Sequence, residues 1–440
     1  MSMQSGMSRR GFIQAGAALS AALAMNVHGA QETPPVKTVR VGMVGVGSRG
    51  TFLTNTLLQL PGVEIPAVCD INPDHAARAK DIVEKAMGKA PELYTQGERD
   101  WERLVARDDL DAVITATPWQ WHTPVMVAAM KAGKYGGTEV PAALTVEECW
   151  DLVRTSEETG KPCMMLENVC YFENALAILR MVREGVFGEL IHAEAGYQHD
   201  GRFVMISGKG DLLWRGEHAI KSNGNLYPTH PIGPVAQWMN INRGDRFTRL
   251  VSMSAKSRGL NYYAAKKFGP DHPLAKQRFA LGDLNTTLLE TENGCTVTLY
   301  FDLGTPRPYD LIFRLQGTRG ICMGAWDKIY LEDVSPQKEQ WEPFAPYMQK
   351  YMHPIWKDLN AGSIQSGHGG GDYITVHQFI QAVRNNTQTP QDVYDAAAWS
   401  VIVPLSIQSA TAHGDPMEFP DFTAGKWKTN PPIEIKGVSV

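Results

Sequence analysis

Hydrophobic residues in the first part of the chain fall into short continuous runs separated by amphipathic stretches. "VRVGMVGV" is an almost continuous apolar run, as expected of a strand buried on both faces of a sheet, and "VEIPAVCD" and "LDAVITATP" are predicted to be later strands. A stretch such as "PDHAARAKDIVEKAMG" has helical spacing instead, with Pro73 near its first turn. Strands that alternate with helices predict a parallel, doubly wound sheet over residues 37–168.

Beyond about Tyr171 the period changes from helical to alternating. "LIHAEAGYQHD", "RLVSMSAKSR" and "LNTTLLETENGCTVTLYFDL" alternate as strands with one buried face do, and the last is interrupted by an Asn-Gly turn. Two late helices, "YITVHQFIQAVRNN" and "DAAAWSVIVPLSIQSATAHG", are expected to close the chain. The fold class predicted is therefore α/β, with an α+β second domain over residues 169–440 built on a mainly antiparallel sheet.

Composition and charge narrow the class of protein. The 440 residues are 43% hydrophobic and 20% charged, which is ordinary for a soluble globular chain. A net charge of -5 favours neither a nucleic-acid nor an anionic-membrane partner. No CxxC or Cys/His cluster occurs among the six cysteines, so no metal site is predicted. The apolar settings of Cys69, Cys149 and Cys163 predict buried free thiols.

The first thirty residues have a pattern of their own. Arg9 and Arg10 are followed by Gly11, Phe12 and an Ala/Leu-rich run too short to span a bilayer comfortably. The segment resembles a twin-arginine export signal, cleaved near Ala30. An amphipathic N-terminal helix is disfavoured because the run is apolar all round. We expect a periplasmic protein with no membrane attachment once the signal is removed.

A glycine-rich turn directly follows the first strand. Gly45, Gly47, Ser48, Arg49 and Gly50 belong to a GxGxxG motif between a strand and a helix, the setting in which helix N–H groups bind a pyrophosphate. Asp70 ends the next strand, where an acid binds a ribose 2′-hydroxyl and repels a 2′-phosphate. A Rossmann domain that binds NAD rather than NADP is predicted, although Arg49 could offset this preference.

The segment "TATPWQWH", Thr115 to His122, ends a later strand at the carboxyl edge of the sheet, where ligands of such folds bind. Trp119 and Trp121 could pack on a cofactor or a sugar, and His122 lies at a helix start. Loop packing of the tryptophans and helix capping by the histidine are equally weighted alternatives.

These motifs carry a family resemblance. The GxGxxG strand, the "ATP…H" strand end and a later E-x-P strand end resemble the Gfo/Idh/MocA oxidoreductases. That family typically has E-K-P, with the lysine acting on the hydroxyl to be oxidised, and it usually has an Asp-x-x-x-His segment in the second domain. This chain has Glu139, Val140 and Pro141 instead, and Leu226 stands where the Asp is expected, while His230 is retained. The replacements disfavour an ordinary alcohol dehydrogenase of this family.

A narrower resemblance covers nearly the whole chain after the signal. "ENVCY", "FGELIHAEAGYQHD", "NGNLYPTHPIGP", "NINRGDR" and "RPYDL" resemble the signatures of glycoside hydrolase family 109. The resemblance implies an exported, NAD-dependent glycosidase that releases terminal α-linked N-acetylgalactosamine from a glycan. It further implies a redox-neutral cycle of oxidation, elimination, water addition and reduction that regenerates the cofactor at each turnover.

Site residues follow from the same resemblance. Tyr171, Tyr227 and His230 are expected to share the roles of base, acid and stabiliser, in an order left open. The sugar pocket is expected to comprise Tyr171, Arg215, Tyr227, Pro228, Thr229, His230 and Tyr309. Cofactor contacts are expected from Gly45, Gly47, Ser48, Arg49, Gly50, Asp70, Trp119, Gln120, Trp121, His122, Glu139, Val140 and Asn168.

Several alternatives stay open at this point. A net NAD(P)-dependent sugar dehydrogenase and a non-catalytic sugar-binding protein are the competing functions. Spacing singles out no pair of catalytic carboxylates, although NAD-dependent glycosidases need none. The oligomeric state is open, a homo-oligomer included. The candidate carboxylates are Glu139, Glu167, Asp200, Glu217 and Asp302.

The paired arginines generate a first prediction. Replacing Arg9 and Arg10 with lysine should trap the protein in the cytoplasm, because the twin-arginine pathway reads this pair. Fractionation of expressing cells, with activity measured in each fraction, tests the expectation. Unchanged periplasmic activity would contradict it.

Overall fold

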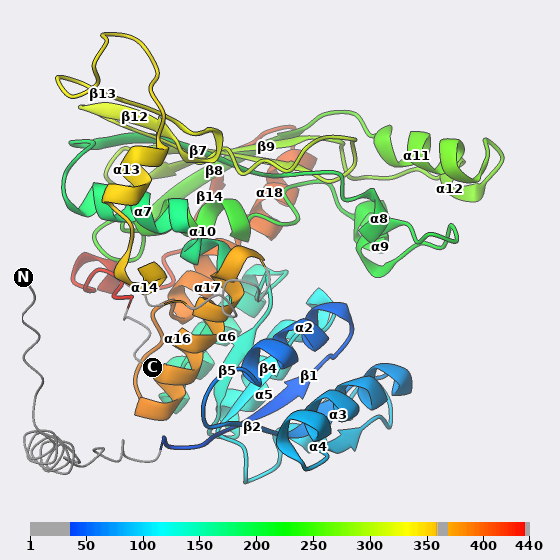
Figure 1. Ribbon diagram of the computed structural model, residues 1–440. Helices are drawn as coiled ribbons and strands as arrows, with labels where there is room; N and C mark the ends of the chain where they lie inside the picture. The colour runs from blue at the N-terminus through cyan, green and yellow to red at the C-terminus, as the bar shows by residue number, and fades with distance from the viewer. Residues whose placement is uncertain (1–35, 358, 360–367, 436–440) are drawn as a thin grey trace, which may run out of the picture. The chain divides into compact units, whose positions relative to one another are not determined.

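The computed structural model of the chain describes residues 36–357, 359 and 368–435, and the predicted export signal lies outside them. Six strands of the first part pair in parallel in the order β3-β2-β1-β4-β5-β6. This order places β1 at the centre and confirms the predicted doubly wound sheet (Figure 1). The strands are β1 (Val39–Val44), β2 (Val63–Cys69), β3 (Glu92–Tyr94), β4 (Ala112–Thr115), β5 (Tyr135–Thr138) and β6 (Cys163–Met165).

The helices that connect these strands begin and end at residues that satisfy or terminate the helical hydrogen-bond pattern. Asn72 caps one helix by accepting from the Asp74 N–H at 2.9 Å, and Gly88 ends it in the left-handed region. Thr145 and Glu148 form a capping box at the start of another. The helices are α2 (Ser48–Leu57), α3 (Pro73–Met87), α4 (Trp101–Val105), α5 (His122–Lys131) and α6 (Val146–Thr159).

The second sheet has eight strands in the order β13-β12-β11-β7-β10-β9-β8-β14. Its pairs are antiparallel except for β7 and β10, which run parallel. The prediction of a mainly antiparallel sheet is thus confirmed, with Asn293-Gly294 in the turn between β9 and β10. The strands are β7 (Leu190–Gln198), β8 (Phe247–Ser254), β9 (Asn285–Thr291), β10 (Thr296–Asp302), β11 (Arg314–Gly317), β12 (Gly320–Met323), β13 (Lys328–Leu331) and β14 (Met417–Glu418).

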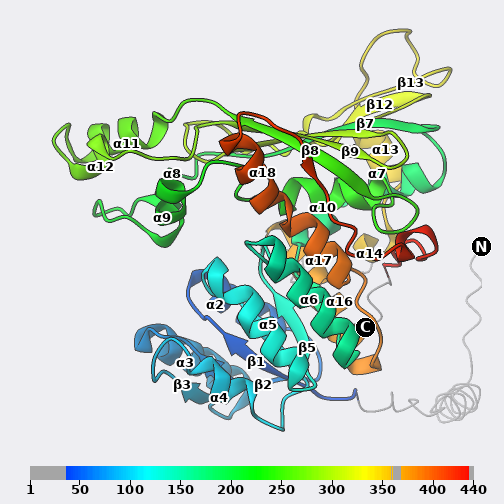
Figure 2. The ribbon, with the colours of Figure 1, turned by 180° about the vertical axis from the view of Figure 1, so that it is seen from behind.

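Helices from the end of the chain contact both sheets. α16 (Gly371–Asn385) packs against α2, and α17 (Val393–Ser400) packs against α6 and β6 (Figures 1 and 2). α18 (Ile402–Thr411) instead packs against β8. Sequence reasoning expected one helix where α17 and α18 are two. Pro404 explains the break, because it has no N–H to donate to the carbonyl of Ser400.

Shorter elements complete the described chain. α10 (Thr229–Trp238) packs against β7 and α7 (Glu173–Arg183). No helix of the described residues is long and apolar enough to cross a bilayer. Within the same residues all six cysteines are free, and five of them are buried. The remaining helices include η1 (Trp119–Trp121), η2 (Asn168–Tyr171), α8 (Arg202–Met205), α9 (Trp214–Lys221), α11 (Gly259–Phe268), α12 (Pro273–Lys276), α13 (Ala345–Lys350) and α14 (Pro354–Lys357).

The glycine-rich turn between β1 and α2 is built by close backbone approach. Gly45 has a φ of +78°, and a Cβ there would lie 2.8 Å from the Thr117 nitrogen. A Cβ on Gly50 would lie 1.8 Å from the Gly45 oxygen, so only glycine lets α2 begin this close to β1. Gly47 differs, because its Cβ would meet nothing nearer than 3.6 Å, at His75. Space is therefore left beside Gly47 for a ligand.

This difference between two glycines generates a prediction. Gly47→Ala should leave the melting temperature of the nucleotide-free protein unchanged but lower NAD affinity by about one to two powers of ten, since the added methyl costs about 1–3 kcal/mol against the pyrophosphate. Gly50→Ala should lower the melting temperature itself, because α2 must move away from Gly45. Thermal unfolding and NAD titration separate the two effects. Equal stability loss in both variants would contradict the assignment.

Candidate active site

The N-terminus of α2 has the features of a pyrophosphate site. Gly47 caps the helix without any side-chain hydrogen bond, and the first turn contains no acid. The N–H groups of this turn and the positive end of the helix dipole are consequently available to an anion.

Asp70 lies beside this turn at the end of β2. Its Oδ2 accepts from the Val46 N–H at 2.8 Å, and its Oδ1 accepts from the Asn72 N–H at 2.8 Å. Each oxygen keeps a further lone pair that a ribose hydroxyl can use. The turn and the carboxylate together fit a dinucleotide that carries no 2′-phosphate.

Arg49 does not offset the charge of Asp70, because its guanidinium is engaged elsewhere. Nε donates to Glu139 at 2.6 Å, and the two terminal nitrogens donate to Asp372 of α16 at 3.1 and 2.7 Å. Burial alone would lower the pKa of Arg49, but the charges of Glu139 and Asp372 outweigh it and raise that pKa. Asn168 joins the network by donating to Asp372 at 2.9 Å. Three of the predicted cofactor residues, Arg49, Glu139 and Asn168, thus meet around one helix terminus.

The "WQWH" segment divides between the site and the protein interior. Trp119 is buried, and its ring lies 5.0 Å from that of Trp214 and 5.9 Å from that of Tyr227. Arg215 extends its guanidinium over Trp214 at 4.2 Å and over Trp119 at 5.6 Å. The structure therefore brings Trp119, which is expected at the cofactor, close to Arg215 and Tyr227, which are expected at the sugar.

The other three residues of this segment make different contacts. Gln120 is exposed, and Trp121 packs edge-on against Trp101 at 6.2 Å. Both ring nitrogens of His122 lie against backbone carbonyls, Nδ1 at 2.7 Å from Pro141 and Nε2 at 2.9 Å from Thr117. Burial lowers the pKa of His122. These bonds tie the segment to Pro141, and cofactor contacts by Gln120, Trp121 and His122 remain predictions.

An aromatic cluster lies at the start of α10. Tyr227 and His230 cross edge-to-face with ring centroids 5.0 Å apart. Tyr197 of β7 contacts both, at 4.8 Å from Tyr227 and 4.9 Å from His230. Burial raises the pKa of Tyr227 well above its ordinary value and that of Tyr197 to about 12. Both phenols therefore keep their protons at neutral pH.

Tyr171 is placed differently from this cluster. It is fully buried on η2, and among the described residues no ring contact joins it to Tyr227 or His230. Burial raises its pKa well above the ordinary value. Tyr197 and not Tyr171 is the tyrosine in contact with both predicted catalytic rings. The catalytic role of Tyr171 stays a prediction.

Of the five candidate carboxylates, Glu167 alone bonds a predicted catalytic residue. Its Oε1 lies 2.7 Å from Nδ1 of His230, and the side chain of Glu167 is fully buried. Asp200 pairs with Arg202, and Asp302 accepts from Thr305 at 2.6 Å. Glu217 is exposed, and Glu139 pairs with Arg49.

Sequence reasoning missed Tyr197, His199 and Asp372. The rings of His199 and Tyr197 lie 4.9 Å apart, and the ring of the half-exposed Tyr309 lies 5.5 Å from that of His199. Burial lowers the pKa of His199. The alternation in "AGYQHD" could have placed Tyr197 and His199 on one strand face. No local signal marks Asp372.

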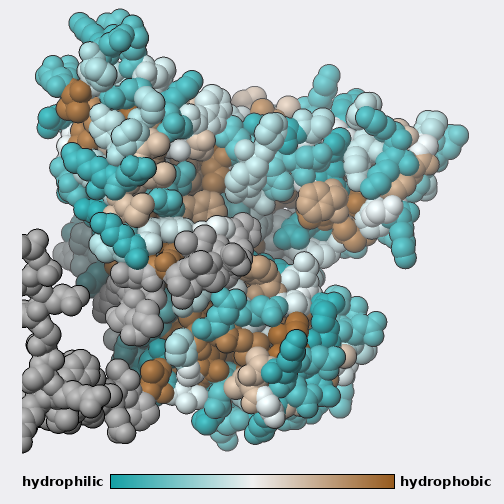
Figure 3. Space-filling view, in the orientation of Figure 1, coloured by the Kyte–Doolittle hydropathy of each residue, from teal (hydrophilic) through white to brown (hydrophobic). Residues whose placement is uncertain are grey.

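Several predicted site residues, and His199 beside them, each have a buried polar atom without a hydrogen-bond partner in the described chain. Each would be costly to bury unless a ligand or water satisfied it. The surface is also hollowed between the α8–α9 segment and α2 (Figure 3). These observations indicate a site for a polar ligand. The atoms include Trp119 Nε1, Asn168 Oδ1, Tyr171 Oη, His199 Nε2 and Thr229 Oγ1.

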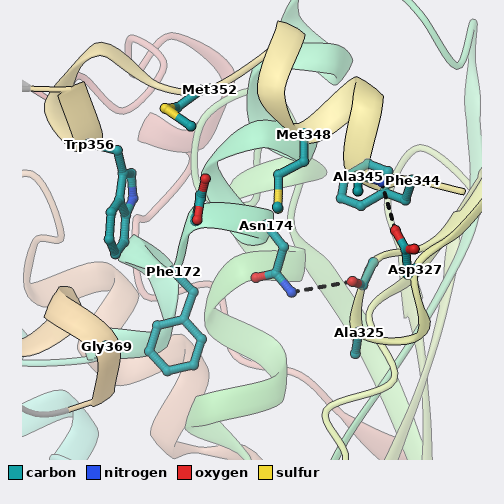
Figure 4. A pocket seen from close by; sticks show the side chains of 12 residues that line it. Phe172, Asn174, Ala325, Asp327, Phe344, Ala345, Met348, Met352, Trp356 and Gly369 are labelled. Atoms are coloured by element: carbon teal, nitrogen blue, oxygen red, sulfur yellow. Dashed lines mark hydrogen bonds between the residues drawn. The ribbon is translucent and has the colours of Figure 1, made fainter. Parts of the chain in front are cut away.

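A separate hollow of about 720 Å³ lies behind η2 (Figure 4). Its wall is largely apolar, with Phe172, Met348 and Trp356 among the lining residues, and none of the predicted catalytic residues lines it. The Trp356 indole donates to the Tyr171 carbonyl at 3.0 Å. The hollow is therefore distinct from the predicted site, although Glu173, Asn174 and Asp327 add polar groups to its wall.

Comparison with known proteins extends these observations. A sequence model described as glycosyl hydrolase 109, C-terminal domain, matches residues 171–429. A second model, described as oxidoreductase family, NAD-binding Rossmann fold, matches residues 39–167. Both resemblances inferred from the sequence are confirmed, and the first domain is an NAD-binding Rossmann domain.

Solved structures show the same fold at low identity. Levoglucosan dehydrogenase in complex with NADH superposes with a TM-score of 0.66 at 21% identity, covering 87% of this chain and 100% of that one. An oxidoreductase domain protein from Kribbella flavida gives a TM-score of 0.69 at 17% identity, with 88% and 100% covered. These likenesses confirm the fold class, a parallel Rossmann-like sheet followed by a mainly antiparallel second sheet.

Curated relatives are much more similar in sequence. A glycosyl hydrolase family 109 protein of Stenotrophomonas maltophilia (strain K279a) is 44% identical over 451 residues, which cover 97% of this chain and 98% of the relative. An alpha-N-acetylgalactosaminidase of Tannerella forsythia is 45% identical over 408 residues, with 88% and 87% covered. Identity of this extent, together with the matched C-terminal domain, shows that the chain belongs to glycosyl hydrolase family 109.

Proposed function

We propose that the protein is an α-N-acetylgalactosaminidase that keeps its NAD through each turnover and releases terminal α-linked N-acetylgalactosamine from a glycan. The activity is that named for the Tannerella forsythia relative. The observation that carries the proposal is a nucleotide turn combined, in one chain, with a buried His–Tyr cluster suited to proton transfer.

Bound NAD would supply a reversible hydride acceptor for C3 of the sugar, so that the proton at C2 becomes acidic while the hydride is held. Gly47, Asp70 and the start of α2 are the groups that would hold it. The Arg49–Glu139–Asp372 network fixes the loop beside them.

Proton transfer at the sugar falls to the residues around α10. His230 is the one member of the Tyr197–Tyr227–His230 cluster with a ring nitrogen that can act as proton acceptor, because burial keeps both phenols protonated. We assign it the removal of the proton at C2. The phenols are hydrogen-bond donors and can stabilise the oxyanion that forms at C3. Trp119, Trp214 and Arg215 form an apolar and cationic wall against which the sugar can pack.

Val140 distinguishes the proposed redox-neutral reaction from the net oxidation of a dehydrogenase. It is 2% exposed and belongs to the hydrophobic core, so it offers no proton acceptor where the resembling oxidoreductases have lysine. A sugar dehydrogenase that exchanges NAD(P) with solution is the alternative function, and the fold shared with levoglucosan dehydrogenase is compatible with it.

We further propose that the protein works after export to the periplasm. The support is the Arg9-Arg10 motif, together with a cofactor that is not consumed. A pathway that exports folded proteins would let NAD bind before export.

A glycoside panel tests the activity. With no added nucleotide, the purified protein should hydrolyse 4-nitrophenyl N-acetyl-α-galactosaminide, because NAD is retained. It should leave the β-anomer intact, because the proposed activity is on the α-linkage. Denaturing release followed by chromatography should recover NAD(H). Formation of NADH in proportion to product, with a need for added NAD, would instead establish the dehydrogenase.

Isotope exchange tests the chemistry at C2. Hydrolysis in D₂O should place deuterium at C2 of the released sugar, since the mechanism breaks that C–H bond, whereas a two-carboxylate glycosidase never does. The same experiment with a conventional α-glycosidase is the control. Unlabelled product together with activity that survives removal of NAD would exclude the redox cycle.

A further inference from the structure

We propose that Glu167 is the positioning residue for His230. Its carboxylate fixes the imidazole in the tautomer with hydrogen on Nδ1, which leaves Nε2 as the proton-accepting atom. The inference rests on the proposed function for its catalytic meaning, and on geometry alone for the tautomer.

The tautomer follows from the chemistry of the contact. Nδ1 of His230 lies 2.7 Å from Oε1 of Glu167. An ionised carboxylate can only accept, so Nδ1 must carry the hydrogen. The Glu167 side chain has no exposed surface, so water does not compete for the bond. No hydrogen bond within the described residues uses Nε2, and the lone pair there is available to a substrate.

Glu167 is itself held in place by its neighbours. Its Oε1 also accepts from the Val169 N–H at 3.1 Å, which caps η2. The main-chain carbonyl of Glu167 accepts from Gln391 at 3.2 Å, and its N–H donates to Met165 at 2.8 Å. The main chain of Glu167 is therefore held by two bonds, and its side chain cannot turn away from His230 without also breaking its bond to the Val169 N–H.

The position of α10 depends on the same carboxylate. Gly233 lies three residues after His230 and so on the same helix face. A Cβ on Gly233 would lie 3.0 Å from Cγ of Glu167 and 2.8 Å from Sγ of Cys170. A glycine at this position lets the helix approach closely enough for His230 to reach Glu167.

Catalysis by such pairs depends on the charged acceptor. Where the carboxylate of a Ser-His-Asp triad is replaced by an amide, geometry is kept but the histidine takes the wrong tautomer, and kcat falls about 10⁴-fold. Oε2 of Glu167 is buried without a partner, so no second cation shares this carboxylate. Its charge acts on His230.

Measurement of the tautomer needs no substrate. In the NAD-bound wild-type protein labelled with ¹⁵N-histidine, His230 should be the Nδ1–H tautomer, its signal being assigned by its loss in His230→Ala. An Nε2–H tautomer would overturn the inference. Because this result does not depend on turnover, it stands even if the glycoside panel fails.

Kinetics of the Glu167→Gln variant test the consequence. Oε1 accepts from both Nδ1 and the Val169 N–H. The amide therefore either keeps its oxygen there, which leaves an uncharged acceptor, or turns its NH₂ to Nδ1, which switches the tautomer and breaks the η2 cap. We expect kcat to fall about 10²- to 10⁴-fold, with KM changed less than about threefold. An unchanged kcat, or loss confined to KM, would overturn the positioning role.

A matched control and a double variant separate positioning from stability. Asp392 is another carboxylate that caps a helix, α17; it is partly buried and pairs with Arg243 at 3.0 Å, outside the site. Asp392→Asn should lower stability but preserve kcat. When Glu167→Gln is added to His230→Ala, kcat should fall less than about threefold below that of His230→Ala alone, since the partner of Glu167 is gone. If the loss of kcat in the double variant equals the product of the two single-variant losses, Glu167 acts independently of His230.

Discussion

The ion-pair network around Arg49 is the constraint on which the nucleotide site depends. One guanidinium in the glycine-rich turn bonds two carboxylates, Glu139 after β5 and Asp372 on α16. A buried charge is costly unless it is paired, and removing one partner leaves the others uncompensated. The three segments must consequently be in place together. The network also keeps Arg49 away from Asp70, which preserves the preference for a ribose without a phosphate.

The first domain could be predicted nearly completely from the sequence. In Val39–Val44 every position except Arg40 is apolar and buried, a pattern typical of a strand covered on both faces. The second sheet was predicted in type but not in detail. Alternation reports that a strand has one buried face and says nothing about its direction, so the parallel pairing of β7 with β10 could not be foreseen. Short elements such as β13 and α12 have too few residues for a period.

Site residues were predictable where one local motif contained them. Tyr227, Thr229 and His230 are neighbours in "YPTH", and Trp119 follows a strand end. Pairings between distant segments were not predictable, because no spacing links Glu167 to His230 or Asp372 to Arg49. Tyr197 lies in the predicted strand "LIHAEAGYQHD", yet its contact with Tyr227 and His230 exists only once β7 and α10 are packed together.

The distance along the chain between Arg49 and Asp372 has a consequence for biosynthesis. The two residues are 323 positions apart. A ribosome adding 5–20 residues per second makes Asp372 roughly 16 to 65 s after Arg49. Once Met165 has been made, the nascent first domain has all six of its strands but still lacks α16 and one of the two carboxylates that compensate Arg49. Translation of the second domain therefore precedes completion of the first, and a chain stopped short of α16 leaves the nucleotide turn unfinished.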